Sequence, residues 1–211
     1  MALLQAARVA EVRVAVLIRL VAATGMRRGE ACAVMWNDLD TKAGTVMIDE
    51  GVVSTEDGAE ARQPKTRSST RKVALDKVTL SELAELRLEQ DALARSCGLK
   101  LTPESFVFSF EPGGGIPPHP DTISHVFAKV RTKAKVASDI HLHSLRHFHA
   151  TQIDSVISEA QKQVRLGWST VQMARHYTDG VPEEDRRAAD HIGHLLTVKP
   201  RNRKKKATAA R

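Results

Sequence analysis

Apolar residues recur every three to four positions near the start of the chain, which is the spacing of one face of an α-helix. Gly25 follows this run and is suited to end a helix in the left-handed conformation. The pattern predicts a helix over roughly residues 6–23 and a second, short helix in RGEACAVMW, residues 28–36. The apolar positions are Val9, Val12, Val16, Leu17 and Leu20 in the first helix and Ala31, Val34 and Met35 in the second.

Between residues 44 and 76, β-branched residues and polar turns replace the helical spacing. The stretch GTVMIDEGVVS is typical of a strand, and EARQPKTRSSTRKVALD indicates two short strands around a polar turn. We expect these segments to form one small antiparallel sheet of three strands.

Helical spacing returns in the rest of the chain. A long amphipathic helix is predicted over residues 79–94, followed by a loop in EPGGGIPPHP and a helix capped by Asp121 or Thr122. Short helices should fill residues 143–196. The long helix carries Leu80, Leu83, Leu86 and Leu93 on its apolar face.

The fold class predicted from these elements is α+β and mostly α, with one domain over residues 1–198 and a basic tail over residues 199–211. The formal net charge of the 211-residue chain is +7, but seven basic residues lie in the tail. The charge of the domain alone is therefore close to zero and does not by itself indicate a nucleic-acid partner. Local basic clusters do: Arg62, Lys65, Arg67, Arg71 and Lys72 in one segment, and Lys129, Arg131, Lys133 and Lys135 in another.

Cysteine content and hydropathy indicate the cellular compartment in which the protein is expected. Cys32 and Cys97 are too few for a disulfide framework and fit a reducing cytoplasm. The sequence has no run of about 18 uncharged apolar residues such as a membrane-spanning helix needs. Its N-terminus lacks the pattern of a signal peptide. We therefore expect a cytoplasmic protein.

Five residues have the chemistry that phosphodiester cleavage by a tyrosine nucleophile requires. One is Lys65, in the basic cluster named above. His143 and Arg146 are three positions apart in HLHSLRHFHA, so a helix would place them on one face. Arg27 follows the glycine cap at a helix start, where backbone N–H groups favour anions. Tyr177, the one tyrosine of the chain, carries a phenol that can act as a nucleophile once it is activated.

Other roles are open for several of these positions. Arg28 could bind the anion in place of Arg27, Lys72 could act in place of Lys65, and Trp168 could pack in the core.

The histidine-rich stretch could instead bind a metal, because His143 and His147 are four positions apart and His141 and His149 are close in sequence. No carboxylate or cysteine joins them in that stretch, which makes a metal site the weaker hypothesis.

Five short motifs, TGMRRGE, PKTRSSTRKVAL, HSLRH, LGWS and RHYT, follow one another along the chain. In this order and rough spacing they resemble the catalytic domain of the tyrosine recombinases, also called the phage integrase family, over about residues 5–196. The resemblance implies the DNA breaking-rejoining fold. It also implies DNA cleavage and rejoining through a 3′-phosphotyrosine link, with no metal, ATP or other cofactor.

The resemblance assigns roles residue by residue. Arginine, histidine and indole groups would hold the scissile phosphate, a lysine would protonate the leaving 5′-oxygen, and the tyrosine would attack phosphorus. Trp168 stands where the family usually has histidine. The implied catalytic residues are Arg27, Lys65, His143, Arg146, Trp168 and Tyr177, with Glu30 in support, and basic residues expected to contact DNA are Arg62, Arg67, Arg71 and Lys72.

Double-stranded DNA is the expected partner, with self-association on DNA into a tetramer through the C-terminal helix. That helix is predicted to start at Pro182, and its apolar stripe should pack on its own domain without DNA and on a neighbouring subunit on DNA. The stripe comprises Ala188, Ala189, Ile192, Leu195 and Leu196.

The family resemblance also bears on the source and extent of the chain. It implies a bacterial or phage-encoded, nucleoid-associated protein. Members of the family usually carry an N-terminal DNA-clamping domain ahead of the first helix, so we expect this chain to be a fragment or a truncated copy.

Three functions fit this resemblance. A site-specific recombinase or integrase is the first. A type IB topoisomerase-like enzyme would use the same chemistry to relax supercoils, and a catalytically silent DNA-binding remnant would keep only the fold. The intact set of implied catalytic residues argues against the remnant, and the short chain and the segment after Tyr177 argue against the topoisomerase.

Overall fold

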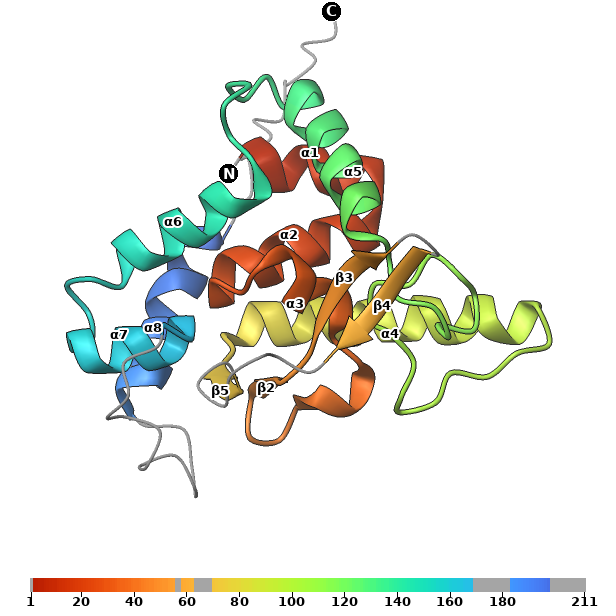
Figure 1. Cartoon of the computed structure of the whole chain (residues 1–211), viewed down its shortest axis with the longest axis horizontal. Helices are drawn as coiled ribbons and strands as arrows, with labels where there is room; N and C mark the ends of the chain where they lie inside the picture. The colour runs from red at the N-terminus through yellow and green to blue at the C-terminus, as the bar shows by residue number, and fades with distance from the viewer. Residues whose placement is uncertain (1, 56–57, 63–69, 169–182, 198–211) are drawn as a thin grey trace, which may run out of the picture.

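The computed structural model describes residues 2–55, 58–62, 70–168 and 183–197 as a mostly helical domain with small antiparallel sheets (Figure 1). Its helices are α1 (Ala2–Ala10), α2 (Val12–Thr24), α3 (Arg28–Ala33), α4 (Lys77–Ser96), α5 (Pro120–Lys133), α6 (Leu142–Gln152), α7 (Glu159–Leu166) and α8 (Glu183–Leu196), with a 3₁₀ turn at Trp36–Asp38. Its strands are β1 (Leu39–Asp40), β2 (Thr45–Ile48), β3 (Gly51–Thr55), β4 (Gly58–Arg62) and β5 (Arg71–Ala74). None of the helices in these ranges has the length and apolar content needed to cross a membrane.

The predicted helix over residues 6–23 is in fact two helices, α1 and α2. Glu11 is in the extended conformation between them and serves as the N-cap of α2. Val9 and Val12, which the spacing assigned to the apolar face, are 75% and 36% exposed. The amphipathic pattern was misleading here because the break at Glu11 interrupts the helical phase, and both valines lie next to this break, outside the buried stretch of residues 14–24.

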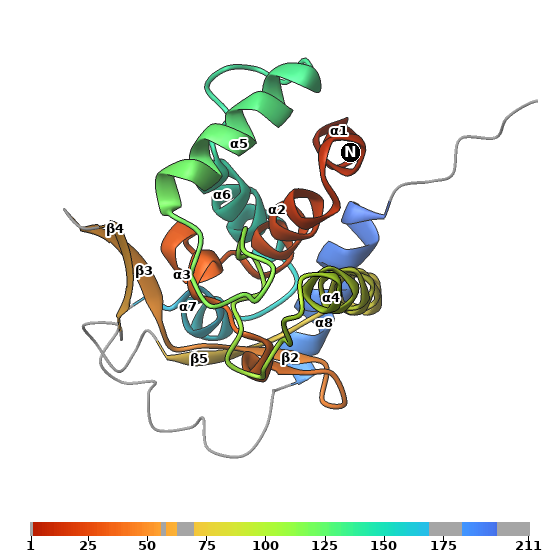
Figure 2. The same ribbon diagram turned by 90° about the vertical axis from the view of Figure 1, so that its right-hand side faces the viewer.

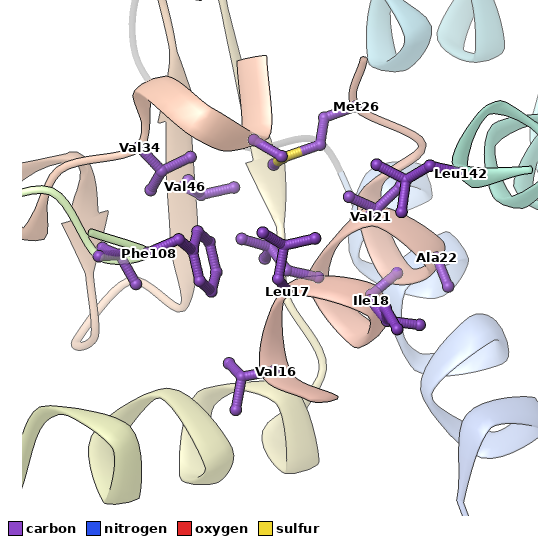
Figure 3. Packing of buried hydrophobic residues seen from close by; sticks show 14 of the residues in the cluster. Val16, Leu17, Ile18, Val21, Ala22, Met26, Val34, Val46, Phe108 and Leu142 are labelled. Atoms are coloured by element: carbon purple, nitrogen blue, oxygen red, sulfur yellow. The ribbon is translucent and has the colours of Figure 1, made fainter. Parts of the chain in front are cut away.

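Helix α2 is the centre of the domain. It lies among α1, α4, α6 and α8 in both views of the ribbon, and every residue from 14 to 24 is buried (Figures 1 and 2). The close view shows Leu17 packed near Phe108 and Val46, with Val21 next to Leu142 (Figure 3). A helix in this position needs apolar residues all round rather than one stripe.

The strands form two sheets rather than one. A three-stranded antiparallel sheet has the order β1-β2-β5, with Val46 opposite Val73, and β3 pairs with β4 in a separate hairpin. The predicted single strand over residues 44–54 is divided between the two sheets. The division falls at the adjacent acidic residues Asp49 and Glu50, a residue type that disfavours strands.

Helix α4 confirms the predicted long helix and extends it at both ends. Asp76 caps it by accepting hydrogen bonds from the backbone N–H groups of Val78 and Thr79. The predicted caps of α5 were wrong. Helix α5 begins at Pro120, whose missing N–H suits the first helical position, and the His119 ring accepts the N–H of Asp121 as the cap.

Helix α8 packs on its own domain, as expected for the chain without DNA. It contacts α2, α4, α7 and β5, and Ala188, Ala189, Ile192 and Leu196 are buried there. Leu195, the fifth residue of the predicted stripe, is 38% exposed. The predicted start of this helix at Pro182 lies outside the described residues.

Candidate active site

Gly25 directs the chain from the central helix into the candidate site. Its φ of +68° is in the left-handed region, and its N–H bonds the Val21 carbonyl to close α2. A Cβ at this position would lie 2.8 Å from both His149 of α6 and Leu166 of α7. The glycine therefore lets α6 and α7 pack directly against the turn that leads to Arg27.

Glu30 is the acceptor at the centre of the site. It receives the Arg27 backbone N–H at 2.7 Å and the Arg27 guanidinium at 2.7 Å. Arg71 of β5 binds the same carboxylate with both terminal nitrogens, at 3.1 and 2.7 Å. A bidentate ion pair of this kind fixes the orientation of the guanidinium and carboxylate planes relative to each other.

These partners keep the Glu30 carboxylate ionised. Burial by itself would raise the pKa of Glu30, but the hydrogen bonds and charge of Arg71, together with the bonds from Arg27, lower it to about 2. Glu30 is therefore ionised at neutral pH and holds Arg27 at the start of α3.

The C-terminal end of α7 presents three successive carbonyl groups to three arginines. The Arg165 carbonyl accepts from Arg71 Nε at 2.9 Å, that of Leu166 from Arg146 at 2.6 Å, and that of Gly167 from Arg27 at 3.3 Å. Carbonyls at a helix C-terminus lack partners within the helix and lie at the negative end of its dipole. The end of α7 thus gathers the guanidinium groups in one place.

Arg146 is held more tightly than Arg27. Its guanidinium donates to the Gly25 carbonyl at 2.5 Å and to Leu166, and the residue is 5% exposed, whereas the side chain of Arg27 is 45% exposed. Burial, and then the neighbouring charge of Arg27, lowers the pKa of Arg146 to about 10. Arg146 remains protonated at neutral pH and can still bind an anion.

His143 lies one helical turn before Arg146 on α6, on the solvent-exposed side. Its ring meets that of His147 edge to face, with centroids 4.7 Å apart. Partial burial, followed by the charges of His147, Arg146 and Arg27, lowers the pKa of His143. The imidazole is therefore predominantly neutral at pH 7 and able to accept a proton.

His149 points into the domain and belongs to a second, buried network. Arg165 Nε donates to His149 Nε2 at 3.0 Å, which places the ring proton on Nδ1, 2.9 Å from the Ala22 carbonyl. With both nitrogens engaged inside the protein, His149 cannot join a metal site with His143 and His147. Across the described ranges, no group of three or more His, Cys, Asp or Glu side chains is arranged to hold a metal.

This buried histidine should make the free energy of unfolding depend on pH. Burial, and then the Arg165 charge, holds the pKa of His149 well below its ordinary value of 6.5, so protonation favours the unfolded chain. Stability from the neutral ring is present above pH 6.5 and is lost as pH falls below it, by up to about 1.4 kcal/mol per pH unit. We expect His149→Gln to remove this loss in urea unfolding between pH 7.5 and 5.

The comparison must be made between variants, because Asp38 contributes with the opposite sign. Burial raises the pKa of Asp38 to about 6, so its protonation in the same range favours the folded state. The His143→Gln variant serves as the control: the pKa of His143 is also lowered, by partial burial and then the charges around it, but the residue is exposed, so its removal should change the pH dependence much less than the removal of His149. An unchanged pH dependence in His149→Gln would contradict the prediction.

The structure brings together Arg27, Glu30, His143 and Arg146 among the residues predicted from sequence. Trp168 lies directly after the α7 carbonyls and is 41% exposed, which excludes the alternative of core packing. Lys65 and Tyr177 lie outside the described residues, as does Arg67.

Two arginines differ from the sequence-based interpretation. Arg71, expected on the DNA-contacting surface, is 4% exposed and bonds Glu30 and the Arg165 carbonyl, so it faces the interior of the site. Arg28, the alternative to Arg27, donates to Asp121 and Ser124 on α5 instead. Arg62 and Lys72 are exposed as expected, and Arg62 is paired with Glu60.

Arg165 and Asp185 are not among the catalytic or binding residues predicted from the sequence. For Asp185 a signal was available, because it lies three and four positions before Ala188 and Ala189 and so continues the apolar stripe of α8. Helix α7 is mostly polar and has no such stripe that could have revealed Arg165.

Comparison with known proteins places the chain in a family. The model of the phage integrase family matches residues 1–184, and the chain belongs to this family. This confirms the resemblance seen in the five motifs.

Curated relatives share a quarter of the aligned residues. The ICEBs1 integrase of Bacillus subtilis (strain 168) is 25% identical over 178 residues, which is 82% of this chain and 46% of that protein. A tyrosine recombinase XerC-like protein of Caldanaerobacter subterraneus is 25% identical over 198 residues, covering 87% and 50%. The chain spans about half the length of the curated relatives it matches.

Solved structures confirm the fold class. The Tn1549 transposon integrase in complex with transposon right end DNA matches with a TM-score of 0.62 and 18% identity, over 87% of this chain and 59% of that chain. XerA recombinase matches with a TM-score of 0.59 and 17% identity, over 94% and 63%. The domain has the fold of the catalytic domain of tyrosine recombinases.

Proposed function

We propose that the protein is a site-specific DNA recombinase or integrase that cleaves and rejoins DNA strands through a 3′-phosphotyrosine intermediate. The observation that carries the proposal is the fixing of two guanidinium groups, those of Arg27 and Arg146, at one site by Glu30 and the α7 carbonyls. Part of the Arg27 side chain remains open to solvent and to a ligand. Two such groups can neutralise the nonbridging oxygens of a phosphodiester as charge develops on them.

The proposed reaction follows from the chemistry of these side chains. Tyr177 attacks phosphorus, and His143, kept neutral by its surroundings, accepts or relays the phenol proton. Trp168 donates its indole N–H to the phosphate, and Lys65 protonates the leaving 5′-oxygen. The energy of the broken ester is kept in the phosphotyrosine bond, so a 5′-hydroxyl of another strand can reverse the step.

Trapping the covalent intermediate tests this proposal. A nicked suicide substrate loses its short 5′-hydroxyl strand after cleavage and leaves the protein attached to the 3′-phosphate. We expect an SDS-resistant adduct whose DNA-linked peptide contains Tyr177. Transfer of the attached strand to a second duplex distinguishes recombination from relaxation alone, and the absence of any adduct across candidate sites would contradict the proposal.

The same assay predicts independence from metal ions. Because arginine, histidine and indole groups supply the charge stabilisation, adduct formation should proceed at an unchanged rate in excess EDTA. The control adds magnesium back to the EDTA-treated protein. A strict requirement for a divalent ion would contradict this prediction and favour a metal site at the exposed histidines of α6.

Double-stranded DNA is the proposed substrate, and Arg62 and Lys72, which are exposed, contact its phosphates together with Arg67, which lies outside the described residues. We also propose that the protein is cytoplasmic and nucleoid-associated and that it is of bacterial or phage origin.

Self-association on DNA, into a tetramer through the C-terminal helix, completes the proposal. Removing α8 would not test it, because this helix supplies buried residues to its own domain. A photo-crosslinker at Leu195→Cys, in a Cys97→Ser background, should instead join two protomers on a two-site DNA. The matched control carries the crosslinker at Leu99, which is 48% exposed. Crosslinks confined to one chain, or equal on one-site DNA, would contradict docking on a neighbour.

A further inference from the structure

Arg165 connects five elements of the fold from inside the domain. Its side chain is fully buried on α7, and it donates to His149 of α6 at 3.0 Å and to the Asp185 carboxylate of α8 at 2.6 Å. It also donates to the carbonyls of Ala23 at the end of α2, at 2.9 Å, and of Ala74 at the end of β5, at 3.2 Å. A guanidinium is tolerated in such a place only when its N–H groups are paired in good geometry.

Asp185 completes this pairing from the first turn of α8. One carboxylate oxygen accepts from Arg165, and the other accepts the Ala74 backbone N–H at 2.6 Å. The residue is 1% exposed. Together, Arg165 and Asp185 fix the end of α7 against β5 and against the start of α8.

The part of α7 that is fixed in this way is the part that holds the site. The carbonyls of residues 165, 166 and 167 receive Arg71, Arg146 and Arg27 in turn. A shift or rotation of this helix end would move the three acceptors together and change where the guanidinium groups lie.

We propose that Arg165 and Asp185 are positioning residues: their buried ion pair sets the end of α7 and, through its carbonyls, the placement of Arg71, Arg146 and Arg27. The catalytic consequence rests on the function proposed above. Neither side chain touches the substrate, so the pair acts on the rate only through the arginines.

Two variants and a matched control test the proposal. Asp185→Asn removes the negative charge at nearly constant volume, and Arg165→Lys keeps the positive charge but loses the fork geometry. Ile192→Ala is the control, because it creates a cavity under α8 and leaves the polar contacts of Arg165 in place. Thermal unfolding identifies a temperature at which each protein is folded, and if Arg165→Lys does not fold, Asp185→Asn carries the test.

The decisive measurement compares two substrates. One has a normal scissile phosphodiester, and the other a methylphosphonate, in which a neutral methyl group replaces one nonbridging oxygen. Misplaced guanidinium groups should slow adduct formation on the phosphodiester by about 100-fold at saturating DNA, with DNA affinity unchanged. The loss should be much smaller on the methylphosphonate, which has less charge to neutralise, whereas Ile192→Ala should affect both substrates equally.

Full activity of Asp185→Asn, or equal losses on the two substrates as in the control, would overturn the positioning role. If the wild type forms no adduct, the proposed function fails, and hydrogen exchange at Arg71 Nε, followed by NMR, decides the inference by itself. This N–H donates to the Arg165 carbonyl, so exchange should be faster in Asp185→Asn than in the wild type. Equal exchange rates would overturn it.

Discussion

Tyr177→Phe should abolish the covalent protein–DNA adduct and leave DNA affinity nearly unchanged. The substitution removes one oxygen atom, which is the nucleophile in the proposed reaction, and keeps the ring. A phenol has no substitute in this chain, because Tyr177 is its one tyrosine. The measurement is SDS-resistant adduct on the suicide substrate, with binding measured in parallel by fluorescence anisotropy.

The control for this result is the wild type treated with protease after cleavage, which should release DNA carrying a short peptide. An adduct of undiminished yield in Tyr177→Phe would show that another residue attacks phosphorus. Loss of binding together with loss of the adduct would indicate a folding defect rather than a missing nucleophile.

Arg146→Lys should slow cleavage by roughly 100- to 1000-fold, the loss seen when a preorganised transition-state donor is removed. Arg146 spans two carbonyls, those of Gly25 and Leu166, and a guanidinium can do so while further N–H groups remain for the phosphate. An ammonium is a point charge with three donors and cannot reproduce this arrangement. The rate of adduct formation at saturating DNA measures the effect.

Arg28→Lys is the matched control for Arg146→Lys. Arg28 is exposed and bonds Asp121 and Ser124, outside the Glu30 network, so the same chemical change there should alter the rate little. A wild-type rate for Arg146→Lys would remove Arg146 from the proposed phosphate site.

The parts of the site that sequence could predict are those set by short spacings. Arg27 and Glu30 meet across one turn of α3, and His143 and Arg146 across one turn of α6, so local periodicity places each pair. The interior position of Arg71 depends on its pairing with Glu30, 41 residues away, which no local pattern encodes. Its basic neighbours therefore made it look like a surface residue.

The elements of the fold that could be predicted from sequence are likewise those set by local patterns. Helix α4 was predictable because one face is apolar and the other polar, whereas α2 is buried almost all round and its boundary at Glu11 interrupts a continuous apolar pattern. The acceptors that hold Arg27, Arg71 and Arg146 at the end of α7 are main-chain carbonyls, present in every residue type. A motif of side chains cannot reveal them.

Gly25 contributes to the site although it has no side-chain functional group. Its carbonyl binds Arg146, its φ is positive, and the place of a Cβ is already filled by His149 and Leu166. A bulkier residue would displace α6 and α7, and with them the groups that hold the arginines proposed to bind the phosphate. In a saturation scan selected for recombination, residue 25 should therefore be as intolerant of replacement as the nucleophile, and its alanine variant should lose stability and activity together.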